Sequence, residues 1–126
     1  MKLLLDTHIL LWAAADTLPR SAKEYINDES NVLFFSPASI WEVVIKNELK
    51  RADFIVDPNL LYKGLLDGGY EQLSITAQHA LMIYAMPAIH KDPFDRILLA
   101  QAVSEGVSFL TADSRLAGYP APVILV

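Results

Sequence analysis

The chain has 126 residues, 53% of them apolar or aromatic, and this composition predicts one compact domain over residues 1–126 and excludes disorder. The net charge of −5 argues against a protein that binds nucleic acid passively through many phosphate contacts. It does not argue against an enzyme that meets phosphate through bound metal. The absence of cysteine excludes disulfides and thiolate sites and fits a cytoplasmic protein, and the apolar runs are too short to span a membrane.

The first half of the chain alternates short apolar strands with helices. The predicted elements are a strand over Lys2–Leu5, a helix over Thr7–Ala15, a helix over Arg20–Glu29 opened by Pro19, a strand over Val32–Phe35, a helix from Pro37 to about Arg51, and a helix from Pro58 that ends at Gly68-Gly69. The two proline helices share one start signal, because Ser36 and Asp57 each place a capping side chain directly before proline.

The second half of the chain continues the alternation. The predicted elements are a weaker strand over Glu71–Ile75, a helix capped by Thr76 that ends near Met86, a helix from Pro93 to Gly106, a strand over Val107–Thr111, one helical turn over Ser114–Ala117, and a strand over Val123–Val126. This order predicts an α/β fold with a short parallel sheet flanked by helices on both faces. Ligands of such sheets bind beyond the carboxyl ends of the strands.

Two acidic residues follow predicted strand ends. Asp6 comes directly after the strand over Lys2–Leu5, and Asp113 comes two residues after the strand that ends at Thr111. Each could simply cap the helical segment that follows it. Taken alone, Asp6 is interpreted first as such a cap, and the functional alternative for both residues is a carboxylate at the ligand-binding edge of the sheet.

A third acidic residue, Glu42, lies inside a predicted helix. Ile45 and Leu49 follow it at positions i+3 and i+7, so the three side chains share one side of the helix. A surface ion pair with Lys46, four residues on, is an even alternative. An acid at the margin of an apolar stripe is costly to bury without a partner, and a metal ion would be such a partner.

A fourth acidic residue, Asp95, begins an apolar stripe in the first turn of its helix. Leu98, Leu99 and Ala102 follow it at i+3, i+4 and i+7. The alternative is structural, because Asp92 as the cap with Asp95 three residues later resembles a capping box. We interpret Asp92 itself as a cap.

Together, these acids predict one metal site at one edge of the sheet. Asp6, Glu42, Asp95 and Asp113 would repel each other unless cations bound them. Ligation by oxygen alone suits Mg²⁺ or Mn²⁺. Competing chemistries are weak, since the three histidines have no metal-ligand spacing and are interpreted as structural, and no glycine-rich phosphate loop or serine nucleophile motif occurs.

Four segments also carry a family resemblance. They are Leu4-Leu5-Asp6-Thr7-His8, Ser39-Ile40-Trp41-Glu42-Val43, His90-Lys91-Asp92-Pro93-Phe94-Asp95-Arg96 and Leu110-Thr111-Ala112-Asp113. In this order they resemble the acidic motifs of PIN domains, and the Trp-Glu and Asp-Pro-Phe-Asp-Arg segments are similar to the VapC toxin branch. The resemblance runs from about residue 3 to the C-terminus.

This resemblance implies a three-layer sandwich, usually a homodimer, that cuts RNA as an endoribonuclease with Mg²⁺ or Mn²⁺. It also implies a cognate antitoxin that blocks the site and through which the pair binds operator DNA. Carried over by residue, Asp6, Glu42, Asp95 and Asp113 match the acidic positions. Thr111 matches a hydroxyl that orients a ligand or water, whereas Ala112 replaces a residue that is charged in many relatives.

The expected chemistry is attack on a phosphate by water whose pKa is lowered by metal, with a 5′-phosphate product and no use of the 2′-hydroxyl. Two other classes remain open. A metal-dependent phosphatase also uses acids beyond parallel strands, but Asp6-Thr7-His8 lacks the usual second acid. A non-catalytic PIN-like module would keep the acids and use the fold for protein contacts.

Overall fold

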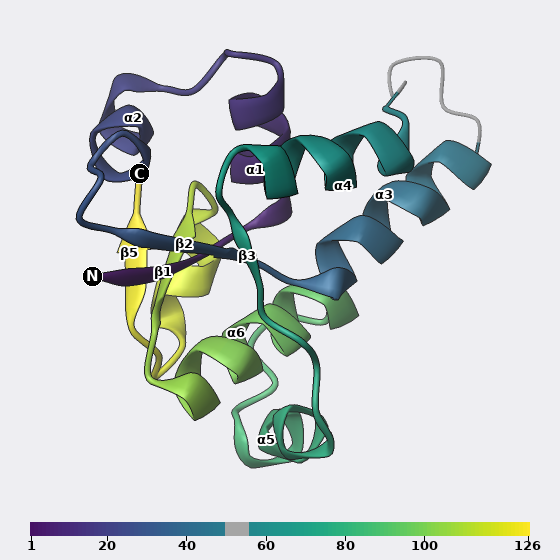
Figure 1. Cartoon of the computed structure of the whole chain (residues 1–126). Helices are drawn as coiled ribbons and strands as arrows, with labels where there is room; N and C mark the ends of the chain where they lie inside the picture. Colours follow the sequence, from purple (N-terminus) through teal and green to yellow (C-terminus); the bar gives the residue numbers. More distant parts are fainter. Residues whose placement is uncertain (50–55) are drawn as a thin grey trace.

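The computed structural model describes residues 1–49 and 56–126, and its strands form one parallel sheet. The strands are β1 (Lys2–Leu5), β2 (Val32–Phe35), β3 (Glu71–Gln72), β4 (Ser108–Thr111) and β5 (Val123–Leu125). Their order across the sheet is β3-β2-β1-β4-β5, and every pairing is parallel (Figure 1). The predicted α/β fold with a parallel sheet is therefore confirmed.

Six α-helices connect these strands within the described residues. They are α1 (Thr7–Ala14), α2 (Arg20–Ile26), α3 (Pro37–Glu48), α4 (Pro58–Asp67), α5 (Ala77–Ala85) and α6 (Pro93–Glu105), and a 3₁₀ turn, η1 (Ser114–Gly118), follows β4. The predicted cap-and-proline starts are confirmed, because Ser36 accepts from the amide of Ala38 at 3.1 Å and Asp57 from that of Asn59 at 2.8 Å. No described helix combines the length and apolar character needed to cross a membrane.

Some predicted boundaries differ from the structure. Helix α2 ends at Ile26 instead of Glu29, because Asp28 accepts from both the amide and the hydroxyl of Ser30, which forms a competing turn. Pro19 is the residue before α2 and not its first residue. The predicted helix end near Arg51 lies outside the described residues.

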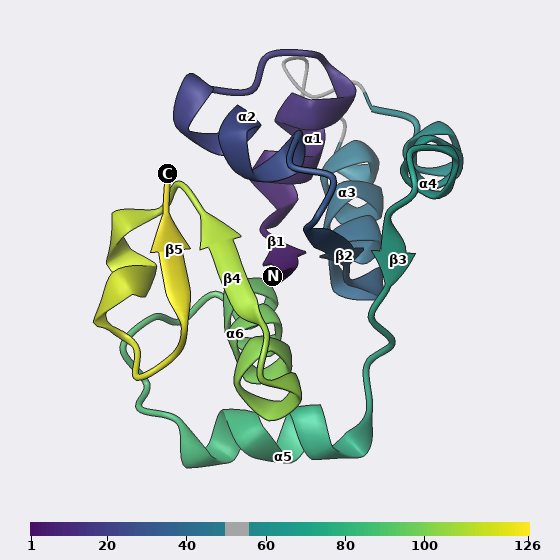
Figure 2. The same cartoon turned by 60° about the vertical axis from the view of Figure 1, so that its left-hand side comes forward.

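The predicted strand over Glu71–Ile75 is reduced to two residues. It lies at the edge of the sheet and pairs with β2 alone, and both side chains are exposed. After one further hydrogen bond, from the amide of Leu73 to the carbonyl of Phe35 at 2.8 Å, the chain leaves the sheet toward α5 (Figure 2). An edge strand without a buried face has little to extend it.

The core consists of two apolar clusters, one on each face of the sheet. Leu3 and Leu5 of β1 belong to the cluster that contains Leu61 of α4, whereas Leu4 belongs to the cluster that contains Leu98 of α6. This is the alternation that a strand buried on both faces requires. Figures 1 and 2 show α1 and α4 on one side of the sheet and α5 and α6 on the other, so the three-layer arrangement is confirmed.

Candidate metal centre

All four acids singled out in the sequence line one cavity beyond the carboxyl ends of β1 and β4. The cavity has a volume of about 500 Å³. Its lining residues are Asp6, His8, Trp12, Glu42, Lys46, Asp92, Asp95, Ala112, Asp113, Ser114 and Arg115. The central strand β1 and its neighbour β4 end here, and α3 reaches the same place after β2. The sheet topology thus gathers acids that lie up to 107 positions apart in the sequence.

Asp6 is the most enclosed of these acids, with 6% of its surface exposed. Both carboxylate oxygens are held, since Oδ1 accepts from the amide of Thr7 and Oδ2 from the hydroxyl of Thr111, each at 2.7 Å. The Thr111 hydroxyl in turn accepts from the amide of Asp113 at 3.0 Å. Burial raises the pKa of Asp6 above its ordinary value despite these hydrogen bonds. Asp6 is therefore both the predicted helix cap and a wall of the cavity.

The structure confirms the ion-pair interpretation of Glu42 and also places Glu42 in the cavity wall, while its role as a metal ligand stays a prediction. Its carboxylate pairs with the ammonium of Lys46 at 3.2 Å, which is the predicted i,i+4 ion pair. The pair does not remove Glu42 from the cavity, because its side chain is only 14% exposed and both residues line the wall. Lys46 thus compensates part of the negative charge of the cavity wall.

Asp95 carries the largest pKa shift in the cavity. Burial, followed by the negative charges of Asp6 and Asp92, raises the pKa of Asp95 to about 7. His90 opposes the shift, because its Nε2 lies 2.8 Å from Asp95 Oδ2. The Tyr119 hydroxyl holds the His90 backbone from both sides, accepting from its amide at 2.7 Å and donating to its carbonyl at 3.2 Å.

Asp92 caps α6, as its interpretation predicted. Its Oδ1 accepts from the amides of Phe94 at 2.8 Å and Asp95 at 3.2 Å. Only this half of the capping box forms, because the carboxylate of Asp95 turns to His90. Asp92 also lines the cavity, so it contributes negative charge there without having a free side chain.

Asp113 is neutralised by a neighbouring guanidinium. Its two oxygens accept from Nε and Nη2 of Arg115 at 3.0 and 2.8 Å, and Oδ1 also accepts from the Arg115 amide. This arginine holds the pKa of Asp113 below its usual range. The Arg115 side chain is 67% exposed, so the ion pair is a surface one and easily exchanged.

The donor set fits a hard divalent cation. One ligand atom from each of His90, Asp95 and Asp113 lies within 4.8 Å of the other two. Asp6 and Glu42 line the same cavity but are not part of this close group, so the structure brings together only two of the four predicted acids at that spacing. Oxygen donors with at most one imidazole suit Mg²⁺ or Mn²⁺. A bound cation would also offset the desolvation cost and the repulsion that raise the pKa values of Asp6 and Asp95.

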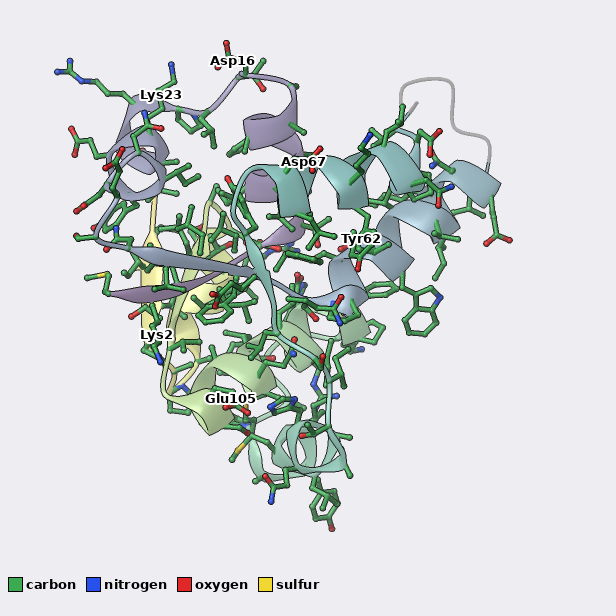
Figure 3. The ribbon with its side chains drawn as sticks, in the orientation of Figure 1. Lys2, Asp16, Lys23, Tyr62, Asp67 and Glu105 are labelled. Carbon is green, nitrogen blue, oxygen red and sulfur yellow. The ribbon has the colours of Figure 1, made fainter. Side chains whose placement is uncertain are left out.

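The histidines divide differently from the sequence interpretation, which made all three structural. His79 is structural, since Nδ1 accepts from the amide of Thr76 and Nε2 donates to Glu105 of α6 at 2.8 Å (Figure 3). His90 instead belongs to the acidic cavity's shell, and His8 lines its wall. The signal for His90 was its place in the segment His90–Asp95, five residues before the acid that it contacts.

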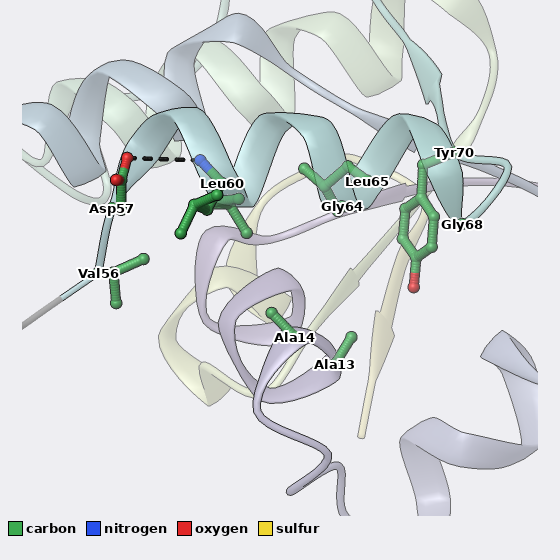
Figure 4. Close-up of a pocket in the computed structure, with 10 residues that line it drawn as sticks. Ala13, Ala14, Val56, Asp57, Leu60, Gly64, Leu65, Gly68 and Tyr70 are labelled. Atoms are coloured by element: carbon green, nitrogen blue, oxygen red, sulfur yellow. Dashed lines mark hydrogen bonds between the residues drawn. The ribbon is translucent and has the colours of Figure 1, made fainter.

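A second cavity of about 520 Å³ lies between α1 and α4 and has a different character. Figure 4 shows that small and apolar side chains line it, among them Ala13, Ala14 and Leu65. Among the described residues that line it, the carboxylate is that of Asp57, which accepts from the amides of Asn59 and Leu60 as the cap of α4. The described lining of this cavity therefore offers no group of side chains for metal or acid–base chemistry.

Comparison with known families agrees with this geometry. The sequence model of the PIN domain matches residues 3–121. The chain belongs to the PIN-domain family. A direct search among curated proteins found no match.

Solved structures share the fold of this PIN domain over its whole length. A chain of VapBC2 from Rickettsia felis, bound to a promoter DNA fragment, has a TM-score of 0.72 at 15% identity, covering 100% of this chain and 98% of that one. DNA-bound VapBC from Salmonella typhimurium has a TM-score of 0.69 at 15% identity, and the match covers 98% of this chain and 97% of that one. FitAcB from Neisseria gonorrhoeae has a TM-score of 0.62 at 14% identity, and the match covers 97% of this chain and 96% of that one.

Proposed function

We propose that this PIN domain is a divalent-metal-dependent endoribonuclease and the toxin of a toxin–antitoxin pair. The observation that carries the proposal is the gathering of Asp6, Glu42, Asp95 and Asp113 around one cavity at the carboxyl edge of the sheet. A cavity lined by this many carboxylates suits a substrate that is bound through metal.

The four carboxylates would hold Mg²⁺ or Mn²⁺, which when bound supplies Lewis-acid stabilisation of phosphate charge and lowers the pKa of water. Asp6 is fixed at both oxygens by Thr7 and Thr111, so its orientation does not depend on the ion. Asp95 is oriented by the imidazole of His90. Preset ligands lower the reorganisation needed when substrate binds.

Lys46 and Arg115 compensate Glu42 and Asp113 in the structure and lie in the wall where phosphate oxygens would enter. When a cation takes over the carboxylates, both side chains become available to the RNA backbone. Attack by water would leave a 5′-phosphate and would not involve the 2′-hydroxyl of RNA.

The test is cleavage of RNA by the purified protein with Mg²⁺, with Mn²⁺ and with chelator. Cleavage should require metal, should leave 5′-phosphate ends, and should be lost in Asp6→Asn. Asp67→Asn is the matched control, because Asp67 ends α4 and is not among the residues lining the acidic cavity (Figure 3). Equal rates in Asp6→Asn and wild type would refute the proposal, and a folded wild type that cuts nothing would favour the non-catalytic module.

The partner side of the proposal rests on the solved relatives, several of which are VapBC complexes, two of them bound to DNA. We expect a cognate antitoxin that copurifies with this chain, binds operator DNA for the pair, and suppresses RNA cleavage. We also expect a homodimer acting in the cytoplasm, where its RNA would be found. Size-exclusion chromatography with light scattering, with and without the antitoxin, tests the assembly.

A further inference from the structure

Two ring side chains of α1, His8 and Trp12, line the acidic cavity beside Asp6. Asp6 caps α1, and the two rings follow it at i+2 and i+6, one helical turn apart on the same side of the helix. Their centroids lie 6.1 Å apart and their planes are inclined by 58°. The rings therefore continue the wall of the cavity from the buried carboxylate along α1.

We propose that Trp12, with His8 beside it, forms a stacking surface for an unpaired RNA base next to the phosphate that is cut. This rests on the proposed nuclease function and specifies how the same site holds its substrate. Every base presents a π face, so stacking gives affinity with little sequence preference. Bases inside a duplex are already stacked on both sides, so the surface selects single-stranded segments.

Because the cavity is acidic, stacking on an aromatic ring is a favourable way to bind RNA there. The chain carries a net charge of −5, and among the described residues of the cavity wall Lys46 and Arg115 each pair with an acid there. Phosphate contacts by these two side chains must therefore first replace existing ion pairs, which reduces their net contribution to RNA binding. An aromatic ring gives binding energy that needs no positive charge.

Trp12 is also held in place before any substrate arrives. Its ring is half-buried and packs against the apolar cluster that contains Ile9 and Leu10. Its carbonyl accepts from the amide of Thr17 at 2.9 Å, which secures the chain after α1. A side chain that is already ordered loses little conformational entropy on binding.

The chain supplies a matched control in Trp41, the only other tryptophan of the sequence. Trp41 precedes Glu42 on α3 but is not among the residues that line the acidic cavity. It is 61% exposed, and its ring meets that of Phe94 edge-on at 5.2 Å. The two tryptophans thus differ in their access to the site, while both are near it.

The first test is steady-state cleavage of a single-stranded RNA and of the same sequence in a duplex. Trp12→Leu should raise KM for the single strand about tenfold with a smaller effect on kcat, and Trp12→Tyr should restore most of the loss. Trp41→Leu should leave KM unchanged. A Trp12→Leu enzyme with the KM of wild type would overturn the proposal, as would equal cleavage of strand and duplex.

The second test measures binding without turnover. In a Trp41→Phe/Asp95→Asn protein, Trp12 is the single tryptophan and a proposed catalytic carboxylate is absent. With Mg²⁺ present, a short single-stranded RNA should quench Trp12 fluorescence, whereas an abasic strand of equal length and charge should not. Quenching by both strands alike, or by neither, would overturn the stacking proposal.

The two proposals fail separately. Base-dependent quenching by a protein whose wild type cuts no RNA would support stacking and refute the nuclease function. Metal-dependent cleavage without base-dependent quenching would support the nuclease function and refute stacking.

Discussion

At the residue scale, the carboxylates of the site have pKa values shifted in opposite directions. Burial and neighbouring charge raise the pKa of Asp95 to about 7, whereas Arg115 holds that of Asp113 below its usual range. The difference follows from exposure and partners, because Asp95 faces other acids and Asp113 faces a guanidinium. The two carboxylates are therefore expected to respond differently to substitution at the site.

Asp95→Asn should stabilise the metal-free protein at pH 8 and abolish cleavage. The raised pKa means that wild type bears no penalty from Asp95 below pH 4, loses stability as pH rises, and bears the full penalty above pH 7. The full shift would correspond to about 4 kcal/mol at about 1.4 kcal/mol per pKa unit. Solvent screening of this partly buried group reduces the expected gain of the variant to on the order of 2 kcal/mol at pH 8, with little gain at pH 4. Chemical denaturation at both pH values measures it, and a variant that is less stable at pH 8 would restore the capping interpretation.

Arg115→Gln should tighten Mn²⁺ binding. A cation that takes the carboxylate of Asp113 must displace a bidentate but exposed guanidinium, whose ion pair is weakened by solvent screening. Removing this competitor should lower Kd by roughly two- to fivefold in isothermal titration calorimetry. A weaker Kd in the variant would mean that Arg115 supports the ion instead of competing with it.

At the scale of elements, residues at the starts of helices supply several of the acids that line the cavity. Helix α1 begins after Asp6, α6 after Asp92 and η1 after Asp113, and each of these acids caps its element while lining the cavity. Capping and site-building are therefore not alternatives here, because the carboxyl edge of a parallel sheet is where helices begin. Asp92 shows how the two roles can be weighed.

Asp92→Ala should cost about 1 kcal/mol of stability through the lost cap and should spare most RNA cleavage. Asp57→Ala is the control, since Asp57 caps α4 with the same two-amide pattern before proline but lies outside the acidic cavity. The two variants should lose similar amounts of unfolding free energy in denaturant titrations and should retain similar rates of RNA cleavage. A stable Asp92→Ala protein without activity would make Asp92 a ligand.

At the scale of the whole molecule, acids from four separate segments of the chain meet in one cavity. Four carboxylates line the cavity together with Asp92, and among the described residues Lys46 and Arg115 pair with two of these carboxylates. The fold therefore retains unfavourable electrostatic energy that metal can remove.

Millimolar Mn²⁺ or Mg²⁺ should raise the Tm of the wild type by several degrees. An ion that binds only the native state stabilises it by mass action, with about 2.7 kcal/mol at a hundredfold excess over Kd. Differential scanning fluorimetry of wild type, Asp6→Asn and Asp67→Asn checks this, and only Asp6→Asn should lose the shift. No shift in wild type at saturating metal would contradict a preformed site.

The sequence by itself determined the elements and their order. Alternating apolar strands and helices, with Ser36 and Asp57 before proline, predicted a parallel sheet with helices on both faces, and the structure confirms it. Asp6 and Asp113 could be assigned to the carboxyl edge, because strand ends are local features that the sequence marks. Local signals failed at Glu71–Ile75, where strand length depends on pairing partners.

Only the tertiary structure decided which side chains face each other. The ion pair between Glu42 and Lys46 is local, but whether it also borders the cavity depends on how α3 packs against the sheet. The contact of His90 with Asp95, the Thr111 hydroxyl between Asp6 and Asp113, and the place of Trp12 in the cavity wall are equally tertiary. Burial and charge at a site come from segments far apart in the chain, so local spacing cannot specify them.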